Sequence, residues 1–120
     1  MSNRIGIDLG GTKTEIMLTE DDVTKILEKK RVPTNQHKGY EFIINQIVDL
    51  INEYKLKCDQ PPSIGIGIPG SISKTTGLVR NSNTLCLNRK PLKKDLESRV
   101  ELPVIVENDA NCFALSEALL

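Results

Sequence analysis

Apolar and polar residues alternate along the first quarter of the chain, which is the pattern of β-strands. Residues 4–9 alternate, two glycines interrupt the pattern, and residues 14–19 resume it. After an acidic turn, residues 23–32 form a third candidate strand that includes Ile26 and Leu27. Strands joined by such short turns predict an antiparallel meander.

The hydrophobic period becomes that of a helix over residues 40–54, where the apolar side chains fall on one stripe. Residues 63–68 predict a short strand, which the Pro-Gly pair at residues 69–70 stops. Residues 76–79 predict a small hairpin.

Two more helices and one more strand are predicted in the last third of the chain. Pro91 suits the first position of a helix that runs through Leu96. Residues 103–106 predict a strand, and residues 110–115 predict a helix. A meander followed by alternating helices and strands favours an α/β fold, with a mixed β-sheet flanked by helices. The last helix stops without a capping glycine, so the chain is expected to be cut within a longer protein.

Composition and charge narrow the class of protein. The chain has 120 residues, enough for one domain, and 16 basic residues balance 16 acidic ones. A nucleic-acid partner held by phosphate contacts needs a basic surplus, so none is expected. No apolar run approaches the length of about 18 residues that a membrane span needs. The acid and the glycine in residues 5–8 argue against a signal peptide.

The three cysteines favour reduced thiols in a cytosolic protein. Cys58, Cys86 and Cys112 are an odd number and have no short Cys-x-x-Cys spacing. A zinc site would need four ligands, and His37 is the only histidine in the sequence. No zinc site is therefore expected from these residues.

The glycines after the first strand could bring the backbone close to a phosphate. Their N–H groups and the Thr12 hydroxyl can donate to phosphate oxygens. Asp8, at the end of the strand, could hold a hydrated Mg²⁺ beside the same phosphates. An ordinary Gly-Gly hairpin followed by a solvated Lys13 is the alternative. A Walker loop is excluded, because Lys13 leads into a strand and not a helix.

Residues 65–70 formally match the GxGxxG pattern, but a dinucleotide site is rejected. Gly65 and Gly67 fall inside the predicted strand, no helix opens after Gly70, and the position 20 residues later is Lys90, not an acid. Close packing against a neighbouring strand or helix is favoured for Gly65 and Gly67. The Pro-Gly-Ser turn that follows lies at the carboxyl end of a strand, where ligands collect.

Asn108 and Asp109 lie between the last predicted strand and the last predicted helix. Capping of that helix explains both residues and is worth about 1 kcal/mol. Alternatively, Asp109 is a general base and Asn108 orients a substrate hydroxyl. Taken alone, this stretch favours capping.

Together, residues 8–13, 65–70 and 107–112 resemble, in order and spacing, the motifs of the ROK sugar kinases. This is a group of repressors, open reading frames and kinases. The resemblance extends from Ile5 to about Leu119 and implies an actin-like, ribonuclease H-like fold. Over residues 71–83 the chain is most similar to bacterial fructokinases, and N-acetylglucosamine kinases come next.

The resemblance implies a role for each matching residue. The first loop would face the β- and γ-phosphates of ATP, with Asp8 holding Mg²⁺ through water. Asp109 would be the catalytic base for the 6-hydroxyl of a hexose. The residues expected to contact the two substrates are Gly10, Gly11, Thr12 and Lys13 for the nucleotide, and Gly70, Ser71, Asn83 and Asn108 for the sugar.

The remaining family features would have to follow residue 120. They are the acidic and histidine side chains that close the sugar site, a zinc motif, a second phosphate loop and the adenosine pocket. Residues 1–120 are thus expected to be the N-terminal lobe of a cytoplasmic, homodimeric hexose kinase, inactive alone, with fructose as the favoured acceptor. The alternatives are an N-acetylglucosamine kinase, a glucokinase, or a sugar-sensing regulator without catalysis.

Overall fold

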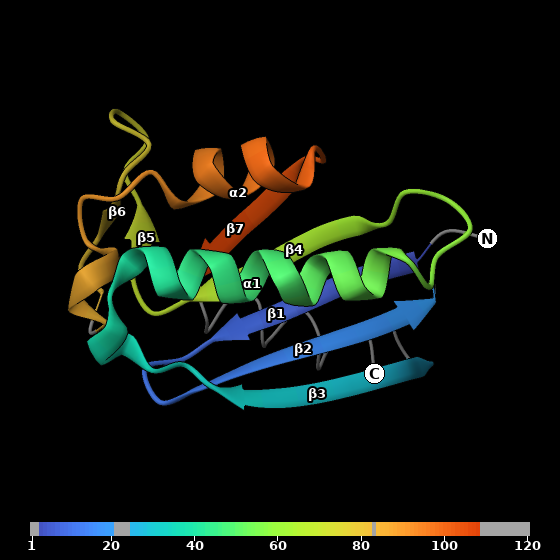
Figure 1. The fold of residues 1–120 in the computed structure, drawn as a ribbon. Coiled ribbons are helices and arrows are strands. Elements are labelled where there is room, and N and C mark those ends of the chain that lie inside the picture. The colour runs from blue at the N-terminus through green and yellow to red at the C-terminus, as the bar shows by residue number, and fades with distance from the viewer. Residues whose placement is uncertain (1–2, 21–24, 83, 109–120) are drawn as a thin grey trace.

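The computed structural model describes residues 3–20, 25–82 and 84–108 (Figure 1). The elements follow one another as β1 (Asn3–Leu9), β2 (Lys13–Glu20), β3 (Ile26–Pro33), the 3₁₀ turn η1 (Gln36–Lys38), α1 (Tyr40–Lys55), β4 (Ser63–Ile68), β5 (Ser71–Ile72), β6 (Val79–Arg80), the 3₁₀ turn η2 (Leu85–Leu87), α2 (Leu92–Val100) and β7 (Val104–Asn108). The helix predicted over residues 110–115 lies outside the described residues.

Five strands form one mixed sheet in the order β3-β2-β1-β4-β7. The first three pair antiparallel, which confirms the predicted meander. β4 pairs parallel to both β1 and β7. A separate small sheet joins β5 to β6 across the predicted hairpin, where Gly77 has a φ of +74°.

Both helices cover the same face of the main sheet (Figure 1). The parallel strands are added in one direction, from β1 to β4 to β7. Parallel crossovers are right-handed, so successive crossovers in one direction leave their helices on one side. Within residues 3–20, 25–82 and 84–108, no helix is long and apolar enough to cross a membrane.

The core lies between α1 and the central strands. The predicted apolar stripe of α1 is buried, and opposite it lie the inward residues of β1 and β4. Burying each such side chain contributes about 1.5–3 kcal/mol. The residues at the centre of this core are Ile43, Ile44, Ile47, Ile51 and Tyr54 of α1, Ile5, Ile7 and Leu9 of β1, and Ile64, Ile66 and Ile68 of β4.

Polar contacts fix α2 against α1. The Tyr40 hydroxyl donates to Asp95 Oδ2 at 2.5 Å. Arg99 donates to Glu41 Oε2 at 3.0 Å, and Lys55 Nζ donates to the Val100 carbonyl at 2.9 Å. Burial and the hydrogen bond to Asp95 raise the pKa of Tyr40, so the phenol stays protonated.

The structure corrects three local predictions. The third strand, predicted from residue 23, begins at Ile26: Lys25 is not part of it, and residues 23–24 lie outside the described residues. Ile26 and Leu27 belong to the strand as predicted and are 44% and 46% exposed, because they lie on the edge strand of the sheet. Pro91 is the N-cap of α2, and the helix begins one residue later. Close packing at Gly65 was wrong: a Cβ built there meets no atom of the described residues within 4 Å.

Candidate active site

The carboxyl ends of three parallel strands bring the predicted motifs to one edge of the sheet. Asp8 of β1 pairs with Gly67 of β4, and Ile68 of β4 pairs with Asn108 of β7. The strand ends of open α/β sheets are where ligands bind. Asp8, Asn108 and the turn after β4 therefore share one edge.

The glycine loop after β1 is a tight hairpin between antiparallel strands. The Gly10 N–H donates to the Lys13 carbonyl at 3.0 Å. A Cβ at Gly10 would lie 2.8 Å from that oxygen, so a side chain is excluded there. Thr12 and Lys13 are exposed, and Gly11 is partly so. The hairpin thus offers accessible N–H groups, a hydroxyl and an ammonium group on one turn.

A second segment, residues 34–36 between β3 and α1, holds this hairpin in place. Thr34 accounts for two contacts: its hydroxyl donates to the Gly10 carbonyl at 2.7 Å, and its N–H donates to the Thr12 carbonyl at 2.9 Å. Gln36 Nε2 donates to the Gly11 carbonyl at 3.0 Å. The turn between β3 and α1 is therefore part of the site.

The turn after β4 is locked in place by its glycine. Gly70 has a φ of +128°, and a Cβ there would lie 2.6 Å from the Arg80 carbonyl. Only glycine suits that position. Asn108 Nδ2 donates to the Gly70 carbonyl at 2.7 Å and so ties β7 to this turn. Ser71, the next residue, pairs with Arg80, whose Nε donates to the Ser71 hydroxyl at 3.4 Å.

Residues 82–88 bring a further loop against the hairpin. Asn88 holds Ser82 from both sides: the Ser82 N–H donates to Asn88 Oδ1 at 2.9 Å, and Asn88 Nδ2 donates to the Ser82 carbonyl at 3.1 Å. Thr84 is fully buried, and its hydroxyl lies 3.5 Å from the position of a Cβ on Gly11. That hydroxyl has no hydrogen-bond partner among the described residues.

Of the predicted site residues, the structure brings together Asp8, the hairpin at residues 10–13, Gly70, Ser71 and Asn108. Asn83 and Asp109 lie outside the described residues, so their roles stay predictions. The sequence did not point to Thr34, Gln36 and Thr84. These residues are far from the hairpin in the sequence and come close to it only in the folded chain. The Pro-Thr-Asn-Gln run at residues 33–36 was the available signal, since such polar residues form hydrogen-bonded turns.

The donor set at this edge fits Mg²⁺. Asp8 is an exposed carboxylate beside the hairpin. Mg²⁺ keeps several waters and is held by one or two carboxylates together with substrate phosphates, so a single carboxylate suffices. In residues 3–20, 25–82 and 84–108, no cluster of His, Cys, Asp or Glu could hold a metal by itself. Burial raises the pKa of the Cys58 and Cys86 thiols, so neither is poised as a thiolate ligand.

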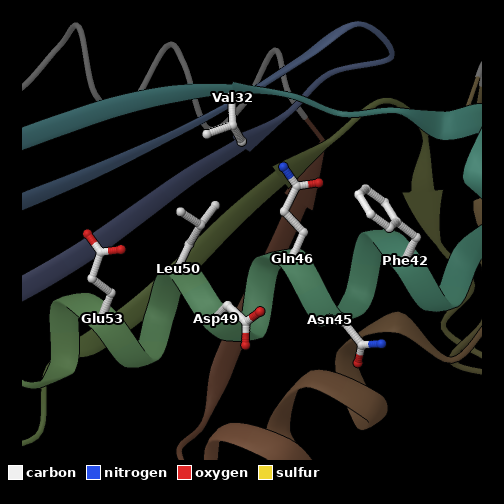
Figure 2. Close-up of a pocket in the computed structure, with 7 residues that line it drawn as sticks. All are labelled: Val32, Phe42, Asn45, Gln46, Asp49, Leu50 and Glu53. Carbon is white, nitrogen blue, oxygen red and sulfur yellow. The ribbon is translucent and has the colours of Figure 1, made fainter.

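A groove of about 310 Å³ lies elsewhere, between β3 and the outer side of α1 (Figure 2). It contains none of the predicted site residues. Its lining combines apolar side chains with amides and carboxylates; the residues are Val32, Phe42, Asn45, Gln46, Asp49, Leu50 and Glu53.

A mixed sheet with helices on one face and a glycine hairpin at its carboxyl edge defines a protein of the actin-like ATPase and hexokinase fold. A profile of the ROK family matches residues 4–120. The chain belongs to the ROK family. The resemblance inferred from the three motifs is therefore confirmed.

Relatives of the chain include bacterial N-acetyl-D-glucosamine kinases. The chain is 42% identical, over 113 residues, to the N-acetyl-D-glucosamine kinase of Haemophilus influenzae (strain 86-028NP), covering 94% of this chain and 36% of that protein. The chain thus spans about a third of that relative's length.

Two solved structures have the same fold. The ROK family glucokinase from Streptomyces griseus, in complex with glucose and AMPPNP, superposes with a TM-score of 0.78 at 31% identity, over 92% of this chain and 34% of that one. The ROK hexokinase from Thermus thermophilus superposes with a TM-score of 0.80 at 30% identity, over 98% of this chain and 39% of that one.

Proposed function

We propose that this chain is the N-terminal lobe of an ATP-dependent hexose kinase that phosphorylates the 6-hydroxyl of N-acetyl-D-glucosamine. One observation carries the proposal. The hairpin at residues 10–13, whose N–H groups can bind phosphate, lies at the same edge of the sheet as the Asn108–Gly70 contact. The Haemophilus relative, an N-acetyl-D-glucosamine kinase, supports the choice of class. The rest of both substrate sites would come from the remainder of the protein.

The proposed roles divide between the two substrates. The hairpin at residues 10–13 binds the terminal phosphates of ATP, and Asp8 holds Mg²⁺ through water. When bound, Mg²⁺ neutralises charge on those phosphates. Gly70, Ser71, Asn83 and Asn108 border the sugar. The role given to Asn108 agrees with its position, because its amide is already oriented by the Gly70 carbonyl.

The proposed reaction is an in-line phosphoryl transfer. The 6-hydroxyl oxygen of the sugar forms a bond to the γ-phosphorus while the bond from that phosphorus to the β–γ bridging oxygen breaks, and ADP leaves. Asp109 accepts the proton of the hydroxyl as the attack proceeds. Positioning and charge neutralisation supply most of the rate enhancement in such transfers. Hydrogen bonds that make the hairpin and the Gly70 turn rigid would supply the positioning.

The sugar that accepts the phosphate is the open choice within this proposal. Fructose was favoured on the resemblance of residues 71–83 to bacterial fructokinases. The 42% identity to an N-acetyl-D-glucosamine kinase extends over nearly the whole chain and favours that sugar instead. We accordingly place N-acetylglucosamine first and fructose or glucose second. We also propose a cytoplasmic, homodimeric enzyme.

Kinetics on the full-length protein test the proposal. Turnover of MgATP is measured with N-acetylglucosamine, glucose and fructose in turn. The proposal predicts the highest kcat/KM for N-acetylglucosamine. A higher value for fructose would show that fructose is the acceptor, and the protein would still be a hexose kinase. Sugar binding by calorimetry without phosphorylation of any of the three would instead favour a non-catalytic sugar-sensing regulator.

A further inference from the structure

The turn between β3 and α1 contacts three of the four carbonyls of the hairpin at residues 10–13, the phosphate hairpin of the proposed function. Three consecutive carbonyl oxygens, of Gly10, Gly11 and Thr12, each accept a hydrogen bond from Thr34 or Gln36, at 2.7, 3.0 and 2.9 Å. All three donors come from one short segment, so the three carbonyls face the same side.

The direction of these carbonyls decides where the amides point. In a planar trans peptide the C=O and N–H bonds point in opposite directions, and the described residues contain no cis peptide. Holding the three carbonyls toward Thr34 and Gln36 therefore turns the following N–H groups, of Gly11, Thr12 and Lys13, away from them. Consecutive N–H groups that point one way form an anion-binding concavity.

The N–H groups of Gly11 and Thr12 are available for a ligand. Neither donates to an acceptor in the part of the chain that the structure describes. Both residues are at least partly exposed, so an anion can reach them. The hairpin in this conformation is already arranged for a phosphate.

Thr34 is buried and its hydroxyl is the centre of this arrangement. Its one proton is donated to the Gly10 carbonyl, so the 2.8 Å bond between the Thr14 and Thr34 hydroxyls is donated by Thr14. Thr14 thereby fixes the rotamer of Thr34. Gln36 adds an exposed contact that contributes nothing to the core.

We propose that Thr34 and Gln36 are positioning residues that aim the amides of the phosphate hairpin at the terminal phosphates of the nucleotide. This inference rests on the proposed function, because it takes the anion to be that nucleotide. Neither residue touches the ligand. Each acts by holding a carbonyl on the opposite side of a peptide unit.

The test is carried out on the full-length protein with the variants Thr34→Val and Thr34→Ser. Valine keeps the shape and the main-chain N–H but removes the hydroxyl, and serine restores it. AMPPNP affinity is measured by calorimetry in the presence of Mg²⁺, alongside KM for the sugar. We expect Thr34→Val to weaken AMPPNP binding about tenfold, Thr34→Ser to stay within about twofold of wild type, and the sugar KM to be nearly unchanged.

Thr19→Val is the matched control. Thr19 is also a buried threonine of the meander, and it lies at the far end of β2 from the hairpin. It should leave AMPPNP affinity unchanged. Gln36→Ala tests the same idea at an exposed site where folding is not at risk, with an expected loss of about threefold.

The outcomes separate the inference from the function. If Thr34→Val and Gln36→Ala both bind AMPPNP like wild type, the positioning role is refuted. Equal losses of nucleotide and sugar affinity in Thr34→Val, without a loss in Gln36→Ala, would also refute it and indicate a purely structural threonine. A wild type that binds AMPPNP but phosphorylates no sugar would refute the proposed function, and the affinities would still decide the role of Thr34. A wild type that binds no AMPPNP would overturn both.

Discussion

Asn108 donates a hydrogen bond from its side-chain amide to the Gly70 carbonyl, at 2.7 Å and across 38 positions of the chain. The contact joins the end of β7 to the turn after β4, where the sugar is proposed to bind. Because it involves the amide nitrogen, it also fixes which side-chain atom of Asn108 faces that turn.

Asn108→Asp should weaken both the turn and sugar binding. The substitution places a carboxylate oxygen against a carbonyl, which removes one hydrogen bond and adds repulsion, at a cost of about 1–3 kcal/mol in unfolding free energy. We expect the KM for the sugar to rise at least about tenfold in the full-length protein, measured by steady-state kinetics. Asn3→Asp loses a comparable 3.3 Å contact, to Thr19, far from the site, and should leave kinetics unchanged. An unchanged sugar KM in Asn108→Asp would contradict the prediction.

Gly70→Ala should be far more destabilising than Gly65→Ala. At Gly70 the backbone has a φ of +128° and a Cβ would lie 2.6 Å from a carbonyl oxygen, so we expect a loss of about 3 kcal/mol or more. At Gly65 a Cβ meets no atom of the described residues within 4 Å, and alanine loses less conformational entropy on folding. Urea denaturation of both variants checks the difference. Equal midpoints would show that the turn relaxes around the new side chain.

Tyr40→Phe should destabilise the fold near neutral pH, whereas Tyr54→Phe should not. The Tyr40 hydroxyl donates to Asp95, so its loss should cost about 1 kcal/mol or somewhat more. The buried Tyr54 hydroxyl has no hydrogen-bond partner among the described residues, so removing it should be neutral or stabilising. Thermal unfolding at constant pH measures both. Destabilisation by both substitutions to the same extent would contradict the assignment.

Tyr40 also makes stability depend on alkaline pH. Burial and the hydrogen bond to Asp95 raise its pKa in the folded state, so folding favours the protonated phenol. This contribution is complete below the unfolded pKa of about 10 and is lost as the pH rises above it. Unfolding free energies measured from neutral to alkaline pH should therefore fall above about pH 10, and more steeply in wild type than in Tyr40→Phe. Parallel curves would show that other groups dominate.

Asp109→Asn in the full-length protein tests the proposed base. The amide keeps the shape and an oxygen that can cap a helix, but it cannot accept the proton of the sugar. General-base catalysis is worth about 10²–10⁴-fold, and we expect kcat to fall by at least that factor with ATP affinity nearly unchanged. If Asp109 only caps a helix, kcat stays near normal and only Asp109→Ala loses stability. An Asp109→Asn enzyme within about tenfold of wild type would remove this residue from the mechanism.

The elements were predictable where one face of a strand or helix is buried. The apolar pattern of residues 40–54 predicted α1, and that of residues 63–68 predicted β4, because these apolar positions must face the core. The exposure of Ile26 and Leu27 was not predictable, since both are apolar but lie half-exposed on an edge strand. Alternation cannot distinguish such residues from core residues.

The candidate site was predictable only where its residues stand in motifs. Gly10 and Gly70 can be recognised in the sequence because their backbone geometry excludes a side chain and so requires glycine. Thr34 does not, since its contacts depend on β2 and β3 pairing across 20 or more positions. The expected packing of Gly65 failed for the same reason: a pattern within one strand does not say what covers its outer face.

β3, the outermost strand of the meander, carries Glu28, Lys29, Lys30 and Arg31 in succession. All four charges are engaged with neighbours on the same molecule. Lys30 pairs with Glu53 at 2.7 Å and Glu28 pairs with Lys57, while Lys29 and Arg31 both pair with Glu15, at 3.5 and 2.7 Å. A foreign strand docking there would have to displace or bury these ion pairs. The sheet is thus protected from lengthening on this side, which favours a protein that resists fibril-like aggregation and assembles, if it does, through other surfaces.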